Sequence, residues 1–326
     1  MTAPFLITTP TDLQPMPFTH TSMEKPHGEV PGPDSDNVLD LSEELNTLTK
    51  SDAVMKLAAH LEPLPATVSR LMALNANACD LADVAGAIRM DPVLTLKILR
   101  TANSAFSASS LTVSTVDEAV MRLGLGLIIS MALAVSVGKT MSTVVPAYGL
   151  AAGQLWRHSA TAAIAAEILV RLAPHTVPPA TVTAALLHDV GKLIVAQSTS
   201  ADEMAFVHRA RQEAGLSLFE AETEVLEMNH AEVGYIIAQH WNLPERICRA
   251  IMYHHDPGQW DDRMGDAVHL ANLAAGALEA AENDAPPGDQ PAPEVLDRLG
   301  LRDFDFEKFC AQCARRFTQL RALYGA

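Results

Sequence analysis

The sequence predicts an all-α fold, and three observations carry that prediction. Apolar residues recur at the spacing of a helix along most of the chain after residue 38, and no stretch of any length alternates as a strand does. Hydrophobic residues make up 48% of the chain but aromatic residues only 5%, so aliphatic side chains must fill the core, which favours packed helices over a β-sandwich. Prolines and capping residues separate the periodic segments from one another.

The chain divides into four predicted regions. Residues 1–38 are rich in Pro, Thr, Gly and Asp and have no sustained apolar period, so we expect a flexible leader there. We predict an N-terminal helical lobe over residues 39–142 and a second helical lobe over residues 143–285, separated at the proline and glycine of "VVPAYG". A loop and a final helix over residues 286–326 are expected to pack on the second lobe. The predicted architecture is therefore a two-lobed helical bundle.

Local signals mark several helix starts in the first lobe. The expected helix caps are Asp80, Asp91 and either Ser114 or Thr115, and Pro92 suits the first turn behind Asp91. The most apolar stretch, residues 124–138, is about 15 residues long and falls short of the roughly 20 that span a bilayer. We therefore predict a buried core helix that ends near Thr140, and no membrane span.

Charge and cysteine usage exclude several classes of protein. The formal net charge is −16 and no long basic run offsets it, which argues against direct nucleic-acid binding. Cysteines at 79, 248, 310 and 313 are too few and too unevenly spaced for a disulfide framework. Cys310 and Cys313 form a CxxC without the second pair that a zinc site needs, so we expect them to pack in a helix. The N-terminus lacks the basic and apolar regions of a signal peptide, so we expect a cytoplasmic protein.

A polar cluster interrupts an apolar helix at "TAALLHDVGKLIV", residues 181–193. His188 and Asp189 are adjacent, and Lys192 follows one turn later. Asp189 is able to bridge two metal ions about 3.5–4 Å apart for phosphoester cleavage, and Lys192 would then face the phosphate as a point charge. The cluster is therefore either a set of satisfied core polar groups or a site for a metal and a phosphate.

Histidines of the second lobe offer further ligands. His158 follows Trp156, His230 opens a helix, and His254 and His255 close another. Nitrogen and oxygen ligands of this kind suit Zn, Mn, Fe or Ni rather than the all-oxygen shell of calcium. Each of these histidines alone also fits a structural role, bonded to a backbone carbonyl or placed at a helix stop. The residues by themselves leave both interpretations open.

Several motifs, in this order along the chain, resemble a known family. They are "LEPLPATVSRLMAL", "LADVAGAIRMDPVLTLKILRTANSAF", "LWRHS", "ALLHDVGKL" and "NHAEVGYIIAQHWNLPERICRAIMYHHDP". Together they are similar to the HDOD domain, a regulatory branch of the HD phosphohydrolase superfamily. The resemblance covers the chain from near residue 55 to near residue 275. It implies an all-α fold and a place in bacterial signalling, and no known reaction, since HDOD domains are mostly regarded as non-catalytic.

The resemblance also implies a ligand set. The metal positions of the superfamily fall on His158, His188, Asp189, His230, His254 and His255, and its phosphate-contacting lysine falls on Lys192. The closing aspartate falls on Asn272, a neutral and weaker oxygen ligand. Asp266 lies earlier on the same predicted helix and would substitute only if the register of that helix allowed it. The stretch "DPGQWDDRMGDAV" after His255 lacks the Gly-Tyr-Pro signature of the cyclic-di-GMP phosphodiesterase branch.

A second motif lies in the first lobe, in "DPVLTLKILRTANSAF". It places Lys97 and Arg100 on a helix and Asn103, Ser104 and Phe106 at its end. The resemblance implies that this motif stabilises the two-lobe arrangement or forms a partner surface. The residues alone also fit a solvated basic face that ends in a C-terminal cap.

These observations favour a bacterial, cytoplasmic signalling protein that acts through protein partners without turnover. A divalent transition metal (Fe, Mn, Ni or Zn) or a nucleotide is the expected ligand at the histidine cluster. The alternative is a metal-dependent phosphohydrolase acting on a nucleotide or another phosphoester, with Asp189 and Lys192 as its catalytic residues. A third hypothesis is a structural interaction scaffold in which the histidines are packed remnants.

Overall fold

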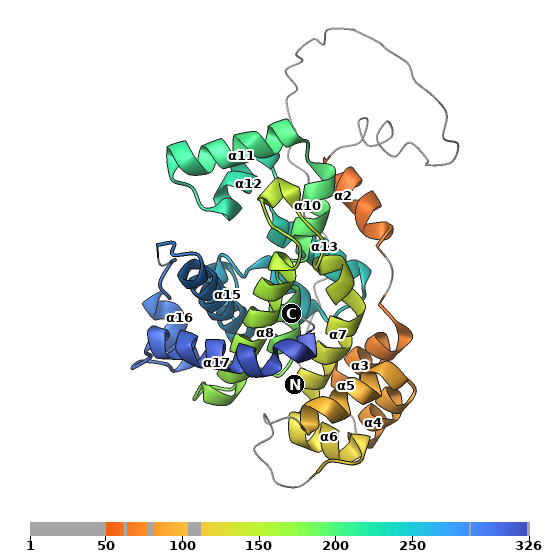
Figure 1. Cartoon of the computed structure of the whole chain (residues 1–326). Coiled ribbons are helices and arrows are strands. Elements are labelled where there is room, and N and C mark those ends of the chain that lie inside the picture. The colour runs from red at the N-terminus through yellow and green to blue at the C-terminus, as the bar shows by residue number, and fades with distance from the viewer. Residues whose placement is uncertain (1–49, 62–63, 77–80, 104–111, 287, 325–326) are drawn as a thin grey trace, which may run out of the picture. The chain divides into compact units, whose positions relative to one another are not determined.

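The structure, a computed structural model, is helical in every region that it describes (Figure 1). Those regions are residues 50–61, 64–76, 81–103, 112–286 and 288–324. Apart from one isolated bridge between Val145 and Leu150, they contain no strand, which confirms the all-α prediction. Several predicted features lie outside the described residues, namely the leader over 1–38, the Asp80 cap, Cys79, Ser104 and Phe106.

Among the described residues, six helices precede the predicted lobe boundary. They are α2 (Lys50–Ala59), α3 (Ala66–Ala76), α4 (Leu81–Arg89), α5 (Pro92–Ala102), α6 (Val116–Leu123) and α7 (Leu125–Met141). The side chain of Asp91 caps α5 by accepting two backbone N–H groups of its first turn, as predicted. Thr115, rather than Ser114, caps α6, and it forms a reciprocal capping box with Glu118. The caps that the sequence predicts for these two helices are therefore confirmed.

Helix α7 is the predicted core helix. Gly124, with a φ of +79°, turns the chain between α6 and α7, a conformation that favours glycine. Most of α7 is buried, and it ends at Met141, next to the predicted end. No single helix among the described residues is long and apolar enough to cross a membrane. Helices α6 and α7 pass that test of length and composition only as a pair, which is bent by 109°.

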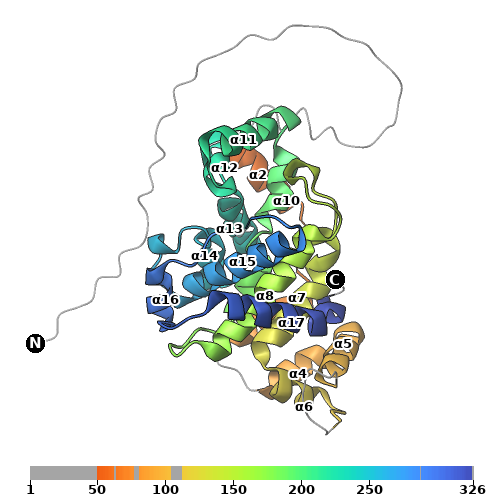
Figure 2. The same cartoon turned by 60° about the vertical axis from the view of Figure 1, so that its left-hand side comes forward.

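The remaining described helices include α8, which packs against α7, α9, α15 and α17. They are η2 (Pro146–Tyr148), α8 (Gln154–Leu172), α9 (Thr181–Leu187), α10 (Gly191–Ser198), α11 (Ala201–Ala214), α12 (Leu218–Leu226), α13 (His230–His240), α14 (Glu245–Met252), η3 (Pro257–Gln259), α15 (Arg263–Glu282), α16 (Pro293–Leu299) and α17 (Phe306–Tyr324). Helices α9, α15 and α17 all pack on α8, and Figure 2 shows α15 and α17 beside it. Close packing is possible because α8 buries a run of alanines, including Ala162, Ala163 and Ala166, whose small side chains keep neighbouring helices near. The division into four regions stays a prediction.

The prediction of one apolar helix through residues 181–193 is wrong at its centre. Helix α9 ends at Leu187 and α10 begins at Gly191, with a turn of three residues between them. Within the turn, the N–H of Val190 bonds the carbonyl of Leu187 and the N–H of Lys192 bonds that of Asp189, each three residues back. These bonds tighten the chain from an α-helix to a 3₁₀-like turn. His188 and Asp189 therefore lie at a helix junction instead of in the middle of a helix.

Candidate metal centre

The seven predicted ligand residues meet at one place, although they come from five parts of the chain. His158 lies on α8, His188 and Asp189 in the α9–α10 turn, His230 at the start of α13, His254 and His255 after α14, and Asn272 on α15. His188, His230 and His254 are fully buried, and Asp189 is almost so. A buried cluster of this composition carries a large desolvation cost unless its members are paired or coordinate a metal.

Two glycines bring the α9–α10 turn against the start of α13. A Cβ atom on Gly191 would lie 1.9 Å from the backbone oxygen of His230, so only glycine fits at this approach. A Cβ on Gly234, one turn into α13, would lie 2.8 Å from the side chain of Ile251. Asn229 starts α13 in a capping box with Glu232, which places His230 in the first turn of the helix, facing Asp189. Local backbone chemistry thus positions the two segments that carry the centre.

The ligands form two groups on the two sides of the Asp189 carboxylate. The first trio is His158, His188 and Asp189, in which both histidine Nε2 atoms approach Asp189 Oδ2, at 3.6 Å and 3.5 Å. The second trio is His230, His254 and His255, whose ligand atoms lie within 4.8 Å of one another. Asp189 Oδ1 faces this second trio, 3.3 Å from His230 Nε2 and 3.9 Å from His254 Nε2.

Four of the five histidines are held by their Nδ1 atoms. Nδ1 of His188 bonds the carbonyl of Ala185 at 2.7 Å, and Nδ1 of His254 bonds that of Ile251 at 2.6 Å. A carbonyl only accepts, so both Nδ1 atoms carry the proton and both Nε2 atoms present lone pairs. Carboxylates hold the Nδ1 atoms of the other two, His158 and His230.

A carboxylate stands behind one histidine of each trio. Glu222 is fully buried and accepts both the backbone N–H and the Nδ1–H of His230, at 2.8 Å and 2.6 Å. Its other oxygen accepts the hydroxyl of Tyr148 at 2.7 Å. Glu279 lies 3.1 Å from Nδ1 of His158, and its side chain is 34% exposed. Carboxylates in this position orient metal-binding histidines and raise their basicity.

Three buried atoms at the centre have no hydrogen-bond partner among the described residues. They are Nε2 of His188, Nε2 of His254 and Oδ1 of Asp189. In addition, Nε2 of His230 lies 3.0 Å from Nε2 of His255. The His230 Nε2 atom carries a lone pair, because the Nδ1–H of the same ring donates to Glu222. Lone pairs that converge in a dry interior are costly, and a cation among them removes that cost. The residues therefore fit a transition metal.

The two trios differ in the positively charged side chains that lie within or beside them. Lys192 Nζ lies 2.5 Å from Asp189 Oδ2, on the side of the first trio. His158 contacts Glu279 through Nδ1 and the Asn272 oxygen through Nε2, at 3.0 Å. Burial lowers the pKa of His158, but Glu279 and Asp189 outweigh it, so the pKa is raised above its usual value. The first trio thus favours a protonated His158 beside the Lys192 ammonium.

His188, His254 and His255 favour the neutral form. Burial lowers the pKa of His188 to about 4, and burial together with His255 and His188 holds that of His254 well below its usual range. Burial and His230 do the same for His255. Burial would raise the pKa of Asp189, but Lys192 and the surrounding histidines hold it well below the usual range. Neutral imidazoles around an ionised carboxylate are the protonation states that metal binding requires.

Comparison with known proteins assigns the chain to a family. The HDOD domain matches residues 61–257, which is more than half of the chain. The chain belongs to the HDOD family. Asn272 and Glu279 lie beyond the matched residues, so the family match covers six of the seven predicted ligands.

Solved HDOD-like structures share this fold. An HDOD domain protein of unknown function from Geobacter sulfurreducens is 24% identical, with a TM-score of 0.61, over 87% of this chain and 98% of that one. A signal transduction protein candidate from Marinobacter aquaeolei VT8 is 22% identical, with a TM-score of 0.62, over 89% of this chain and 67% of that one. A candidate phosphohydrolase from Shewanella amazonensis SB2B is 22% identical, with a TM-score of 0.59, over 84% and 97%.

A longer relative also matches. An uncharacterized protein of Treponema pallidum is 24% identical over 218 residues, which are 65% of this chain and 41% of that protein. The chain therefore spans about two fifths of the curated relative that it matches.

Asp266 does not take the place of the missing aspartate. It is fully buried and both of its oxygens bond Arg298, in an ion pair between α15 and α16. Six residues along a helix turn a side chain by about 240°, so Asp266 and Asn272 face different directions on α15. Asp266 is therefore not a replacement for the missing ligand, and Asn272 and Glu279 are the α15 residues that contact His158.

Sequence reasoning missed the two backing carboxylates. Glu222 is one of three glutamates at alternate positions in "FEAETE", and nothing in that pattern separates it from Glu220 or Glu224. In the structure Glu220 belongs to the Ser217 capping box and Glu224 is exposed. Glu279 lies two helical turns beyond Asn272, in an alanine-rich stretch that carries no motif. Their roles depend on tertiary contacts alone.

Two other predicted features have plain structural roles. Cys313 is buried and Cys310 half-buried on α17, and burial raises the pKa of the Cys310 thiol to about 11, which fits packing. Asn103 is the C-cap of α5, and its side chain also bonds both the N–H and the carbonyl of Val113 at 2.7 Å. Asn103 therefore ties the end of α5 to the segment before α6, while Arg100 on α5 is exposed.

Proposed function

We propose that this HDOD protein holds one divalent transition metal at the second trio and acts in signalling through protein partners. The observation that carries the proposal is the convergence of Nε2 lone pairs from His230 and His254 on Asp189 Oδ1, with both Nδ1 atoms bonded elsewhere. His255 supplies a further nitrogen, 3.0 Å from His230 Nε2. Three imidazoles and one carboxylate are a ligand set that Fe, Mn, Ni and Zn accept.

The proposal is for one ion because the first trio is already supplied with positive charge. Lys192 neutralises Asp189 Oδ2 at 2.5 Å, and His158 favours its protonated form. A second ion would have to displace the His158 proton and share a carboxylate oxygen with an ammonium. Asn272 offers that ion no negative charge in return, whereas an aspartate there would.

A non-catalytic role is supported by how deeply the second trio is buried. The His230 and His254 side chains are not exposed at all, and the Asp189 side chain is 2% exposed. A phosphoester would therefore meet the ion only from the side of His255, which is partly exposed. We infer that the metal, with an ordered ligand set, stabilises the conformation that a protein partner recognises.

One observation favours the second candidate, a metal-dependent phosphohydrolase. Lys192 and His158 form a partly open edge of the set, with side chains 14% and 13% exposed, and a phosphate would meet the centre there. In that case a bound metal would supply Lewis acidity, and Lys192 would bind the phosphate. The name of the Shewanella amazonensis protein makes a hydrolase assay the natural control.

Elemental analysis of the full chain, purified without an affinity tag, tests the proposal. We expect about one equivalent of Fe, Mn, Ni or Zn per chain. A metal-free protein that takes up none of these ions on dialysis would overturn the proposal. The loaded protein should hydrolyse bis(p-nitrophenyl) phosphate no faster than Asp189→Ala, and turnover that Asp189→Ala abolishes would favour the hydrolase instead.

A further inference from the structure

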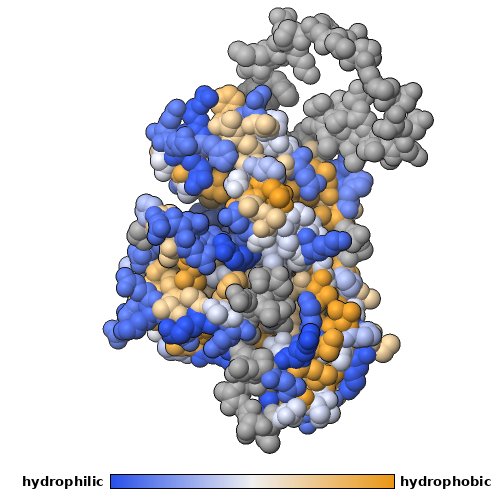
Figure 3. Space-filling view, in the orientation of Figure 1, coloured by the Kyte–Doolittle hydropathy of each residue, from blue (hydrophilic) through white to orange (hydrophobic). Residues whose placement is uncertain are grey.

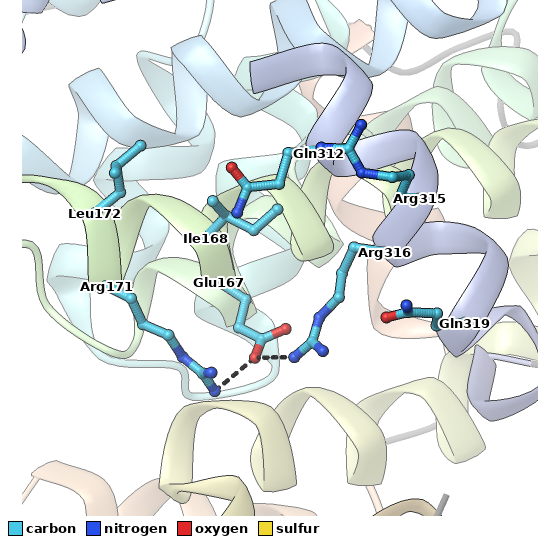
Figure 4. Close-up of a pocket in the computed structure, with 8 residues that line it drawn as sticks. All are labelled: Glu167, Ile168, Arg171, Leu172, Gln312, Arg315, Arg316 and Gln319. Atoms are coloured by element: carbon cyan, nitrogen blue, oxygen red, sulfur yellow. Dashed lines mark hydrogen bonds and ion pairs between the residues drawn. The ribbon is translucent and has the colours of Figure 1, made fainter. Parts of the chain in front are cut away.

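Two glutamates are buried among the described residues, and their charges are compensated in different ways. One oxygen of Glu167, on α8, accepts from the guanidinium groups of Arg171 at 2.7 Å and Arg316 at 3.0 Å, as Figure 4 shows. Glu222, on α12, has no lysine or arginine partner in the described part of the chain. A buried carboxylate is costly unless it is paired or fully hydrogen-bonded, so Glu222 depends on its hydrogen bonds.

Hydrogen bonds hold both oxygens of Glu222. Oε2 accepts the backbone N–H of His230 at 2.8 Å and the Nδ1–H of the same residue at 2.6 Å. Oε1 accepts the hydroxyl of Tyr148 at 2.7 Å, and no other described residue bonds this oxygen. The terminal torsion of a glutamate has a broad energy minimum, so bonds at one oxygen alone define the carboxylate plane poorly. Tyr148 therefore fixes the plane in which Glu222 meets the imidazole of His230.

The partner at Oε1 is a neutral donor. Burial and the Glu222 carboxylate raise the pKa of Tyr148 above its usual value, so the hydroxyl keeps its proton. Unlike the two guanidinium groups at Glu167, a phenol orients a carboxylate without cancelling its charge. Glu222 thus keeps its negative charge for His230, where a carboxylate raises the basicity of a metal-binding imidazole.

A tight turn presents the Tyr148 hydroxyl. Val145 and Leu150 exchange two backbone hydrogen bonds, at 3.0 Å and 3.2 Å, which close the turn around η2. Pro146 opens η2 with its fixed φ, and Gly149, with a φ of +68°, lets the chain reverse directly after Tyr148. The segment that the sequence marks as a lobe boundary therefore also aims one side chain at Glu222.

Helix α11 holds this turn from the surface side. Nε2 of His208 lies 3.0 Å from the carbonyl oxygen of Ala147 and donates to it, because a carbonyl only accepts. Figure 3 shows hydrophilic side chains toward the end of α11, where Arg209 and Arg211 are exposed. Hydrogen bonds, joined by the peptide unit between Ala147 and Tyr148, thus run from a solvated helix to the buried metal centre.

We propose that Tyr148 is a positioning residue of the metal centre, which acts through Glu222 to orient His230 toward the ion. The inference rests on the metal site proposed above and extends it to a residue that bonds no ligand directly. The first trio has no counterpart, because His158 is the sole described partner of the Glu279 side chain. Tyr148 is therefore one reason why the second trio is the better metal site.

A double-mutant cycle of Zn²⁺ affinity in the full chain tests this proposal, with a chelator of known affinity as the competitor. Tyr148→Phe should weaken Zn²⁺ binding about three- to tenfold, less than the roughly 10- to 100-fold loss that follows removal of the direct partner of a ligand histidine. In the Glu222→Gln background the same change should weaken binding less than about twofold, because the carboxylate that Tyr148 orients is already absent. A general loss of stability would instead weaken Zn²⁺ binding by the same factor in both backgrounds.

Tyr235→Phe is the matched control. The Tyr235 hydroxyl also donates to a glutamate, Glu245 at 3.4 Å, but at an exposed contact outside both trios, so this change should leave Zn²⁺ affinity unaltered. The proposal is overturned if Tyr148→Phe binds Zn²⁺ as tightly as the control, or if its loss is the same with Glu222 and with Gln at that position. A parent chain that binds no Zn²⁺ would overturn the metal site as well, whereas unchanged affinity in Tyr148→Phe overturns the role of Tyr148 alone.

Discussion

The two trios that meet at the Asp189 carboxylate are built alike but differ in what surrounds them. Each has one histidine held by a backbone carbonyl and one held by a carboxylate. Behind the second trio, Glu222 is fully buried and bonded at both oxygens. Behind the first trio, Glu279 is 34% exposed, and Lys192 already contacts the Asp189 oxygen that an ion would need.

This difference teaches that the number of ligand residues does not set metal affinity by itself. A histidine binds a metal well when its second nitrogen is held by a desolvated acceptor and when no other cation competes. The second trio meets both conditions, whereas the first trio meets neither fully.

The largest effect is expected from removing a histidine of the second trio. His230→Ala should lower the bound metal from about one equivalent to a trace, because it removes a ligand imidazole. It also leaves the buried Glu222 carboxylate without the Nδ1–H of that imidazole. His158→Ala, the matched change in the first trio, should keep the ion. Elemental analysis of the two variants measures the bound metal. Metal loss in His158→Ala but not in His230→Ala would contradict the assignment of the ion to the second trio.

The next effect concerns the stability of the metal-free protein at low pH. The pKa of His188 is about 4 when folded and about 6.5 when unfolded, so the unfolded chain binds more protons between these pH values. The free energy of unfolding should therefore fall as the pH falls from 6.5 to 4, by up to about 3 kcal/mol from this group. Urea unfolding at pH 7 and pH 4.5 measures it. His188→Asn should lose that part of the pH dependence, and an unchanged dependence would contradict the burial argument.

A smaller effect is expected from the backing carboxylates. Glu222→Gln should weaken metal binding by about 10- to 100-fold, the usual result of losing the partner of a ligand histidine. Glu279→Gln should weaken it by less, since it supports the trio that holds no ion in our proposal. Competition with a chelator of known affinity gives both constants. Equal losses would show that the two carboxylates serve one shared site.

The smallest effect is a gain. Asn272→Asp combined with Lys192→Met should let the first trio take up a second, weaker ion, because the pair of changes adds a carboxylate and removes the competing ammonium. The expected metal content in millimolar Mn²⁺ rises from about one to about two equivalents. Asn272→Asp alone is the control, and it should bind the second ion less well.

Local signals in the sequence were sufficient for much of the fold. Asp91 with Pro92, and the pair Ser114 and Thr115, predicted the starts of α5 and α6 because capping depends on a few adjacent residues. The junction at His188 was missed, because its 3₁₀-like turn is set by the approach of Gly191 to α13. The predicted ligand residues meet at one place, yet Glu222 and Glu279 gave no signal, since only tertiary packing brings them to His230 and His158.

Anomalous scattering from crystals of the metal-loaded protein tests the central claim most directly. Our account predicts one strong peak, about 2.1 Å from Nε2 of His230 and of His254 and close to Oδ1 of Asp189. It predicts no peak of comparable height between His158 and His188. A single peak in the first trio, or no peak in crystals soaked with the metal, would contradict the account.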